Sequence, residues 1–208
     1  MDKFLPAARF NALAERYDFI CEWVGFDTTY RQNIIDALHL PNKKMRVLDV
    51  GCGTGTLAVE LKKEKANVEV HGVDPDEKIL ALARKKIAKN KMEVHLNKAY
   101  AQKLPFPDRH FDAAYSSLVW HHIPDHAKQD CFDEIFRVLK KGGVFVLSDF
   151  GKPKHWWLPS YSHFARFFEE GKANYDGLMP TMMETAGFEL ITSKPLKNSI
   201  ELLVGRKP

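Results

Sequence analysis

Two aspartates and three glycines stand at the ends of apolar segments, where side chains of these types can bind a ligand. The first segment reads VLDVGCGTGTL, with Asp49 just before Gly51, Gly53 and Gly55. Glycine lets the backbone turn sharply and lets a ligand approach without a Cβ atom in its way. The second acid, Asp74, ends the next apolar segment. The pattern predicts a ligand-binding loop; the alternative is a tight turn that holds no ligand.

The spacing of the glycines and the charge of Asp49 indicate which ligand the loop would take. Dinucleotide-binding loops follow G-x-G-x-x-G, whereas this loop follows G-x-G-x-G. The Asp49 carboxylate would repel a pyrophosphate and attract a cation. S-adenosylmethionine carries a sulfonium and an ammonium group and has no phosphate. We therefore expect this cofactor, with Asp74 accepting hydrogen bonds from both ribose hydroxyls; Asp74 could instead cap the next helix.

Alternating strands and helices must position these residues. Strands are predicted over residues 45–50, 67–74, 92–97, 113–119 and 144–150, and helices over 56–65, 75–90 and 127–143. This alternation favours an α/β fold with a doubly wound, mostly parallel sheet. Such a sheet binds ligands beyond the carboxyl ends of its strands, where the glycine loop lies.

The two ends of the chain follow a different pattern. Residues 6–40 read as two helices with a break near the sequence GFDTT. A short helix is predicted near 178–186, and two strands over 187–195 and 198–207 could form an antiparallel edge hairpin. We predict one domain, 1–208: an N-terminal helical cap (1–42), a cofactor-binding core (43–150), and an acceptor-side segment with the C-terminal strands (151–208).

Composition narrows the class of protein. The 208 residues are 45% hydrophobic, enough for one good core, and the net charge of +4 is too small to indicate a nucleic-acid surface. Three widely spaced cysteines favour reduced thiols, with neither a disulfide framework nor a metal site. The sequence has no apolar run near eighteen residues and no signal-peptide pattern. We expect a cytoplasmic protein whose oligomeric state stays open.

Four motifs together resemble the class I S-adenosylmethionine-dependent methyltransferases. They are VLDVGCGTG, GVDP, LPFPDRHFDAAYSSLVWHHIPD and RVLKKGGVFVLSDF, in the family's order, and they cover half the chain. The N-terminal stretch RFNALAERYDFICEWVGFDTTYRQNII resembles, less closely, the ubiquinone and menaquinone C-methyltransferases. The resemblance implies a seven-stranded Rossmann-like methyltransferase fold. It also implies methyl transfer to a small, apolar or aromatic acceptor.

The same resemblance implies a set of cofactor-binding residues. Asp49 and the glycines would line the methionine and ribose side, and Cys52 would lie close to the cofactor inside the loop. Pro75 would lie beside the adenine, and Ser116 and Leu118 near the methionine portion. Leu118 lies near the end of the fourth predicted strand, two residues after Ser116.

This chain departs from the family pattern where many members bond the adenine amino group with an acid. It has Tyr100 there, and a phenol does not ionise near neutral pH. We therefore expect the backbone N–H of Ala101 and apolar packing to hold the adenine. Tyr17, Asp18 and Arg31 could close the N-terminal helices over the cofactor, with Tyr17 or Arg31 reaching its carboxylate; alternatively they are surface or packing residues.

Two histidines follow the fourth predicted strand, where such enzymes place acceptor-side residues. His121 stands where the quinone methyltransferases carry a functional arginine, and we predict it as a catalytic base if the acceptor holds a proton. His122 is predicted to line the acceptor pocket. Both could instead begin a loop that packs against the sheet.

An aromatic segment, HWWLPSYSHFARFF, follows the core. On a helix its aromatic residues would share one face: Trp157, Tyr161, Phe164 and Phe168. The first three are predicted to form a lid over the acceptor. The alternatives are a core-facing insert, or membrane contact supported by nearby basic residues.

Two rival functions remain at this level. One is an S-adenosylmethionine-binding regulatory protein without transfer activity, because one fold hosts many functions. The other is a nicotinamide-dependent dehydrogenase, which the glycine spacing and Asp49 oppose. We expect a small-molecule acceptor and no nucleic-acid partner.

Overall fold

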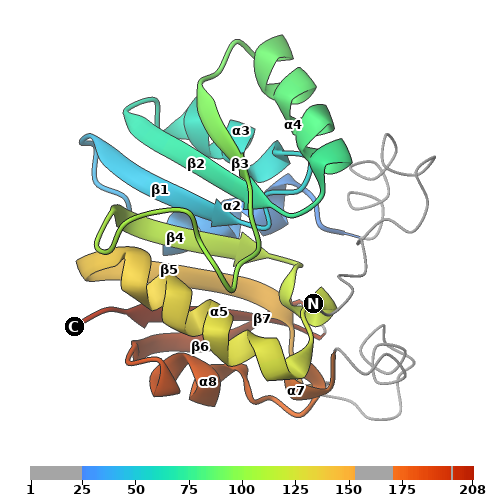
Figure 1. Ribbon diagram of the computed structural model, residues 1–208, viewed down its shortest axis with the longest axis vertical. Helices are drawn as coiled ribbons and strands as arrows, with labels where there is room; N and C mark the ends of the chain where they lie inside the picture. The colour runs from blue at the N-terminus through green and yellow to red at the C-terminus, as the bar shows by residue number, and fades with distance from the viewer. Residues whose placement is uncertain (1–24, 153–170, 198) are drawn as a thin grey trace.

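A computed structural model describes residues 25–152, 171–197 and 199–208 (Figure 1). Its strands are β1 (Met45–Val50), β2 (Val68–Asp74), β3 (Val94–Lys98), β4 (Phe111–Ser117), β5 (Leu139–Phe150), β6 (Glu189–Lys197) and β7 (Ile200–Arg206). Its helices are α2 (Thr28–Ala37), α3 (Thr56–Glu64), α4 (Glu77–Lys89), α5 (Asp125–Val138), α7 (Lys172–Tyr175) and α8 (Met179–Thr185), with a 3₁₀ turn, η2 (Trp120–His122). None of these helices is long and apolar enough to span a bilayer.

The strands form one mixed sheet in the order β3-β2-β1-β4-β5-β7-β6. Strands β1 to β5 pair in parallel, β7 runs antiparallel to β5, and β6 runs antiparallel to β7. This confirms the predicted α/β class, the mostly parallel seven-stranded sheet and the antiparallel edge hairpin. The order reverses direction after β1, so β1 and β4 lie at the point where such sheets bind ligands.

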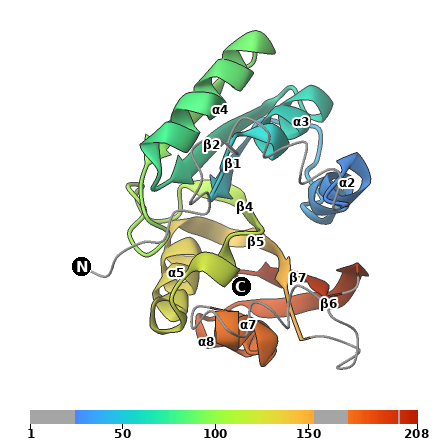
Figure 2. The same ribbon diagram turned by 90° about the vertical axis from the view of Figure 1, so that its right-hand side faces the viewer.

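Helices cover the two faces of the sheet (Figure 2). One core packs α5, α7 and α8 against the sheet, and a second packs α2 and α3 against the opposite face. Strand β1 is covered on both faces, and Val47, Leu48 and Val50 are fully buried. A continuous apolar run of this kind is typical of a central parallel strand.

The predicted boundary between the last core helix and the strand after it is wrong. The helix expected over 127–143 ends at Val138, and the two glycines expected to close it lie within β5. Leu139 already pairs with Phe111 of β4, so the backbone leaves the helix there. Gly142 then takes a left-handed conformation (φ +78°) at a kink where β5 resumes its pairing with β4.

Candidate functional site: a cavity at the switch point of the sheet

A cavity opens at the carboxyl ends of β1, β2 and β4, where the strand order reverses. Its walls come from four parts of the chain: the start of α2, the glycine loop after β1, the end of β2, and the turn after β4. They include Phe26, Tyr30, Arg31, Asp49, Gly51, Cys52, Gly53, Leu57, Asp74, Pro75, Asp76, Ile79, Ser117, Leu118, Val119, His122 and Ile123. The fold thus brings together most of the residues that the sequence motifs predicted.

The glycine loop has the backbone that only glycine adopts without strain. Gly51, Gly53 and Gly55 all have positive φ angles, 76°, 52° and 75°. A Cβ atom on Gly51 would collide with Val119, whereas one on Gly53 would meet no protein atom within 4 Å. The backbone of Gly53 therefore faces open space in the cavity, which fits a loop that cradles a ligand.

Asp74, at the end of β2, is held by the loop it faces. Its Oδ2 atom accepts a hydrogen bond from the Gly53 N–H at 3.1 Å, and its Oδ1 atom accepts one from the Asp76 N–H at 2.9 Å. Burial raises the pKa of Asp74, although these two backbone donors partly offset that effect. Helix α4 is capped instead by Asp76, which accepts from the Lys78 N–H at 2.8 Å. The reading of Asp74 as the helix cap is therefore wrong.

Asp49 is buried near the end of β1 and is only 3% exposed. Its Oδ2 atom accepts a hydrogen bond from the Tyr115 hydroxyl at 2.9 Å. Burial raises its pKa to about 7, the Tyr115 hydrogen bond acts against this, and the nearby Asp74 charge adds to it. Among the described residues, no basic side chain forms an ion pair with Asp49 or Asp74. Within the described part of the chain, the cavity therefore holds two acids that have no cationic partner.

The serine that lines the cavity is the one after the serine predicted from the sequence. Ser116 is fully buried, and its hydroxyl donates to the Val50 carbonyl at 2.7 Å, so it does not line the cavity. The next residue, Ser117, does line it. Side chains alternate along a strand, and the true end of β4 at Ser117 was not visible in the sequence. Leu118 lines the cavity with an unusual positive φ of 56°.

Four further residues were predicted to contact the cofactor, and only two of them line the cavity. Cys52 and Pro75 line the cavity, and burial raises the pKa of the Cys52 thiol well above its ordinary value. Tyr100 is half exposed, and neither it nor Ala101 lines the cavity. The surfaces beyond Pro75 that could take an adenine are instead those of Asp76 and Ile79.

Helix α2 forms one wall of the cavity. Arg31 pairs through Nε with Glu60 at 2.7 Å and donates from Nη1 to the Phe26 carbonyl at 2.8 Å. Tyr30, which the sequence analysis missed, lies within hydrogen-bond distance (2.9 Å) of the hydroxyls of Ser117 and Ser148. These contacts join α2 to the ends of β4 and β5. No local sequence signal identifies Tyr30, since its partners are distant in the chain.

Of the two histidines, only His122 lines the cavity. His121 does not line the cavity; its Nδ1 atom lies 2.8 Å from Oδ1 of Asp149, a buried residue near the end of β5. His122 does line the cavity, and its pKa is lowered to about 4, mainly by burial and also by the neighbouring His121. His122 is therefore a neutral imidazole near neutral pH.

The Asp149 carboxylate holds the turn after β4 through several hydrogen bonds. It accepts backbone N–H bonds from Val119 (2.8 Å), Trp120 (2.7 Å) and Phe150 (2.7 Å) in addition to the His121 contact. Burial alone would raise the pKa of Asp149, but the His121 charge and these donors lower it overall. Because an ionised carboxylate only accepts, His121 donates from Nδ1. The sequence analysis did not identify Asp149.

Several predicted residues lie outside the described part of the chain. These are Tyr17 and Asp18 of the N-terminal segment, and Trp157, Tyr161 and Phe164 of the aromatic segment.

Known proteins share both the sequence and the fold. Residues 47–143 match a family model described as a methyltransferase domain. A demethylmenaquinone methyltransferase of Thermus thermophilus is 36% identical over 69% of this chain and 65% of its own length. The ubiquinone/menaquinone biosynthesis C-methyltransferase UbiE of Geobacter sp. (strain M21) is 32% identical over 77% of this chain and 68% of its own length.

A solved structure extends the comparison to the fold. The S-adenosylmethionine-dependent methyltransferase of Aquifex aeolicus superposes with a TM-score of 0.75 at 19% identity, covering 96% of this chain and all of that one. This likeness shows the fold alone, and the present chain spans slightly less than two thirds of the Thermus relative. With a glycine loop and two acids at the switch point of the same sheet, the chain belongs to the class I S-adenosylmethionine-dependent methyltransferases.

Proposed function

We propose that this protein transfers a methyl group from S-adenosylmethionine to a small, apolar or aromatic acceptor. The observation that carries the proposal is a pair of acids in the cavity, Asp49 and Asp74, which form no ion pair with a basic side chain of the described residues and lie beside the open space at Gly53. A buried carboxylate without a cation is costly. A ligand with positive charges and ribose hydroxyls would satisfy both acids, so the residues present fit this cofactor.

The chain's own residues would hold the cofactor in named ways. The Asp74 carboxylate, fixed by two backbone donors, is placed to accept hydrogen bonds from ribose hydroxyls. Asp49 would supply negative charge to the methionine end, and Pro75 and Ile79 an apolar surface for the base. When bound, the cofactor supplies an electrophilic methyl group; the protein contributes alignment and exclusion of water.

The acceptor side of the cavity is mainly apolar. Phe26, Leu118, Val119 and Ile123 line it together with His122, a surface that suits an apolar or aromatic acceptor. The relatives named as demethylmenaquinone and ubiquinone/menaquinone methyltransferases support an aromatic ring of that kind.

A neutral histidine in the cavity can accept a hydrogen bond from such an acceptor, although its lowered pKa makes it a weak base. His122 is neutral near pH 7 because burial lowers its pKa to about 4. The Asp149–His121 pair fixes the turn that presents His122. In this proposal His122 is the residue that touches the acceptor, and the base role first predicted for His121 becomes a positioning role.

The experiment is a product assay. The purified chain is incubated with S-adenosylmethionine and with demethylmenaquinone, in oxidised and in reduced form, and with a cell extract. Mass spectrometry follows S-adenosylhomocysteine and any compound that gains a methyl group. We expect both products to appear. A chain that binds the cofactor tightly but never forms S-adenosylhomocysteine would instead be a binding protein without transfer activity.

Gly53→Val is the matched inactive variant, because its side chain would fill the space of the cofactor. Gly142→Val is its control: Gly142 also has a positive φ (78°) and open space around its Cβ position, but it does not line the cavity. Both variants would carry a β-branched side chain at a positive φ angle. We expect only Gly53→Val to lose cofactor binding and methyl transfer.

A further inference from the structure

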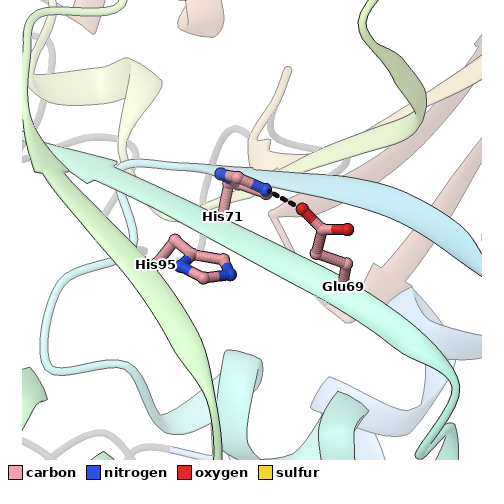
Figure 3. A group of neighbouring side chains, drawn as sticks. All are labelled: Glu69, His71 and His95. Carbon is pink, nitrogen blue, oxygen red and sulfur yellow. Dashed lines mark hydrogen bonds and ion pairs between the residues drawn. The ribbon is translucent and has the colours of Figure 1, made fainter.

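A second cluster of reactive side chains lies on the sheet outside the cofactor cavity. Glu69 and His71 are two residues apart on β2 and point to the same face. His95 on β3 is paired with His71 in the parallel register, so it shares that face. One ligand atom from each residue lies within 4.8 Å of the others. Figure 3 shows the three side chains, Glu69 and His71 on β2 and His95 on β3. The geometry points to a binding site for a divalent transition-metal ion, Zn²⁺ or a neighbour in that series.

The ligand atoms suit this class of ion. Imidazole nitrogen and carboxylate oxygen are common ligands of Zn²⁺, Ni²⁺ and Cu²⁺. The Nε2 atom of His71 lies 2.9 Å from Oε1 of Glu69. Two ligand atoms of a tetrahedral Zn²⁺ ion are separated by roughly 3.3 Å, given bonds of about 2.0 Å. Two of the three ligands therefore already have nearly the required spacing, and the fourth position is left for water.

The site combines a fixed ligand with an accessible one. The His71 side chain is only 13% exposed, and its ring contacts Phe106 and Phe111 edge-on at 5.7 and 5.3 Å between centroids. The His95 side chain is 46% exposed. Packing holds the first ring in place before an ion arrives, which lowers the cost of binding. The second ring leaves the ion a path from solvent.

The position of the cluster indicates a structural role. On the other face of β3, Val94 and Leu96 pack with the apolar residues of α3 and α4. On the face with His71 and His95, the chain between β3 and β4 forms no helix in the described residues. An ion there would join the edge strand β3 to its neighbour β2. His71 lies three residues before Asp74, about 10 Å along the strand. The cluster is therefore separate from the cofactor cavity, and metal binding there does not depend on methyl transfer.

A neighbouring cation gives the proposal a sharp test. Arg46 on β1 is paired with Glu69 in register, and its Nε atom lies 3.6 Å from Oε2 of Glu69. This guanidinium competes with a metal ion for the same carboxylate. Its side chain is 44% exposed, so it can move aside at little cost. Removing its charge is expected to tighten metal binding, which an accidental surface site elsewhere would not show.

No sequence motif indicated this site. We expected no metal centre because the three cysteines are few and widely spaced, and that argument did not consider histidine and glutamate ligands. The ligands are separated by 2 and 24 residues (69, 71, 95), a spacing that matches no common metal motif. Only the parallel pairing of β2 with β3 brings His95 beside His71.

The test is a metal titration of the untagged full chain after treatment with a chelator and its removal. Calorimetry follows Zn²⁺, and visible absorption follows Co²⁺, which absorbs strongly when four-coordinate. We expect one saturable ion per chain. Glu69→Gln and His95→Asn should each weaken binding by at least about tenfold, and Arg46→Gln should strengthen it. His39→Asn, at an exposed histidine outside the cluster, is the matched control and should change nothing.

His95→Asn keeps the test independent of folding, because His95 is half exposed and lies on the edge strand β3. Zn²⁺ should raise the melting temperature of the parent chain and of His39→Asn, and leave that of His95→Asn unchanged. The proposal is overturned if the parent chain binds no Zn²⁺ saturably. It is also overturned if binding survives both Glu69→Gln and His95→Asn, or if His39→Asn weakens it as much as they do.

Discussion

Two buried aspartates near the ends of β1 and β5 have opposite surroundings. Asp49 and Asp149 are each 3% exposed. Asp149 accepts three backbone N–H bonds and the Nδ1–H of His121, and these contacts hold its pKa below the ordinary value. Asp49 accepts the hydroxyl of Tyr115, and burial raises its pKa to about 7. Two aspartates that are equally buried therefore differ in their hydrogen-bond donors: Asp149 has four, and Asp49 has the Tyr115 hydroxyl.

The difference separates a structural acid from a ligand-binding one. A carboxylate whose donors all come from the protein, such as Asp149, stabilises the fold around it. A carboxylate buried without a positive charge, such as Asp49, costs stability unless something outside the chain supplies that charge. Natural proteins place such costs at functional sites. The following variants test whether the two acids differ in this way.

Asp149→Ala should have the largest effect. It would leave the N–H groups of Val119, Trp120 and Phe150 without their acceptor and His121 without its carboxylate. We expect the free energy of unfolding to fall by roughly 3–5 kcal/mol, measured by denaturant titration. Asp149→Asn, which keeps one acceptor oxygen, should lose less. Unchanged stability in the alanine variant would show that Asp149 is not a structural acid.

Asp49→Asn should act in the opposite direction on the protein without cofactor. The folded-state pKa of about 7 lies above the ordinary 3.8, so ionisation of Asp49 opposes folding as pH rises through that window. The variant, which keeps an oxygen for Tyr115, should therefore be more stable than the parent at pH 8, by on the order of 1–4 kcal/mol.

The pH dependence supplies the control for Asp49→Asn. The difference in stability between variant and parent should shrink as pH falls from about 7 towards 3.8, where Asp49 is protonated in both folded and unfolded chains. Thermal unfolding at a series of pH values measures it. A parent chain that is the more stable of the two at pH 8 would mean that Asp49 is not strained.

Asp74→Ala should have the smallest of the three effects, and on binding rather than on folding. It removes charge-assisted hydrogen bonds worth roughly 1.5–3 kcal/mol, so we expect cofactor affinity to fall at least about tenfold in calorimetry. Asp74→Asn, which can still accept the Gly53 N–H, separates loss of charge from loss of the loop contact. Affinity equal to the parent in the alanine variant would place the ribose elsewhere.

The sequence predicted local features well and long-range contacts poorly. The strand over 45–50, the glycine loop and Asp74 are defined by neighbours in the chain, and the structure has them where predicted. The roles of Asp149 and Tyr30 depend on partners 28 to 118 residues away. Ser116 was predicted near the cofactor in place of Ser117 because the end of β4 was not visible in the sequence. Side chains alternate between the two faces of a strand, so an error of one residue selects a side chain on the wrong face.

The most direct test of the account is whether cofactor binding changes the protonation of Asp49. At about pH 6.5, just below its pKa of about 7, much of Asp49 is protonated, and a cationic ligand favours the carboxylate. Titration of S-adenosylmethionine by calorimetry, in buffers of different ionisation enthalpy, counts the protons exchanged. We expect net proton release from the parent chain and its loss in Asp49→Asn. Equal proton exchange in the two chains would contradict it.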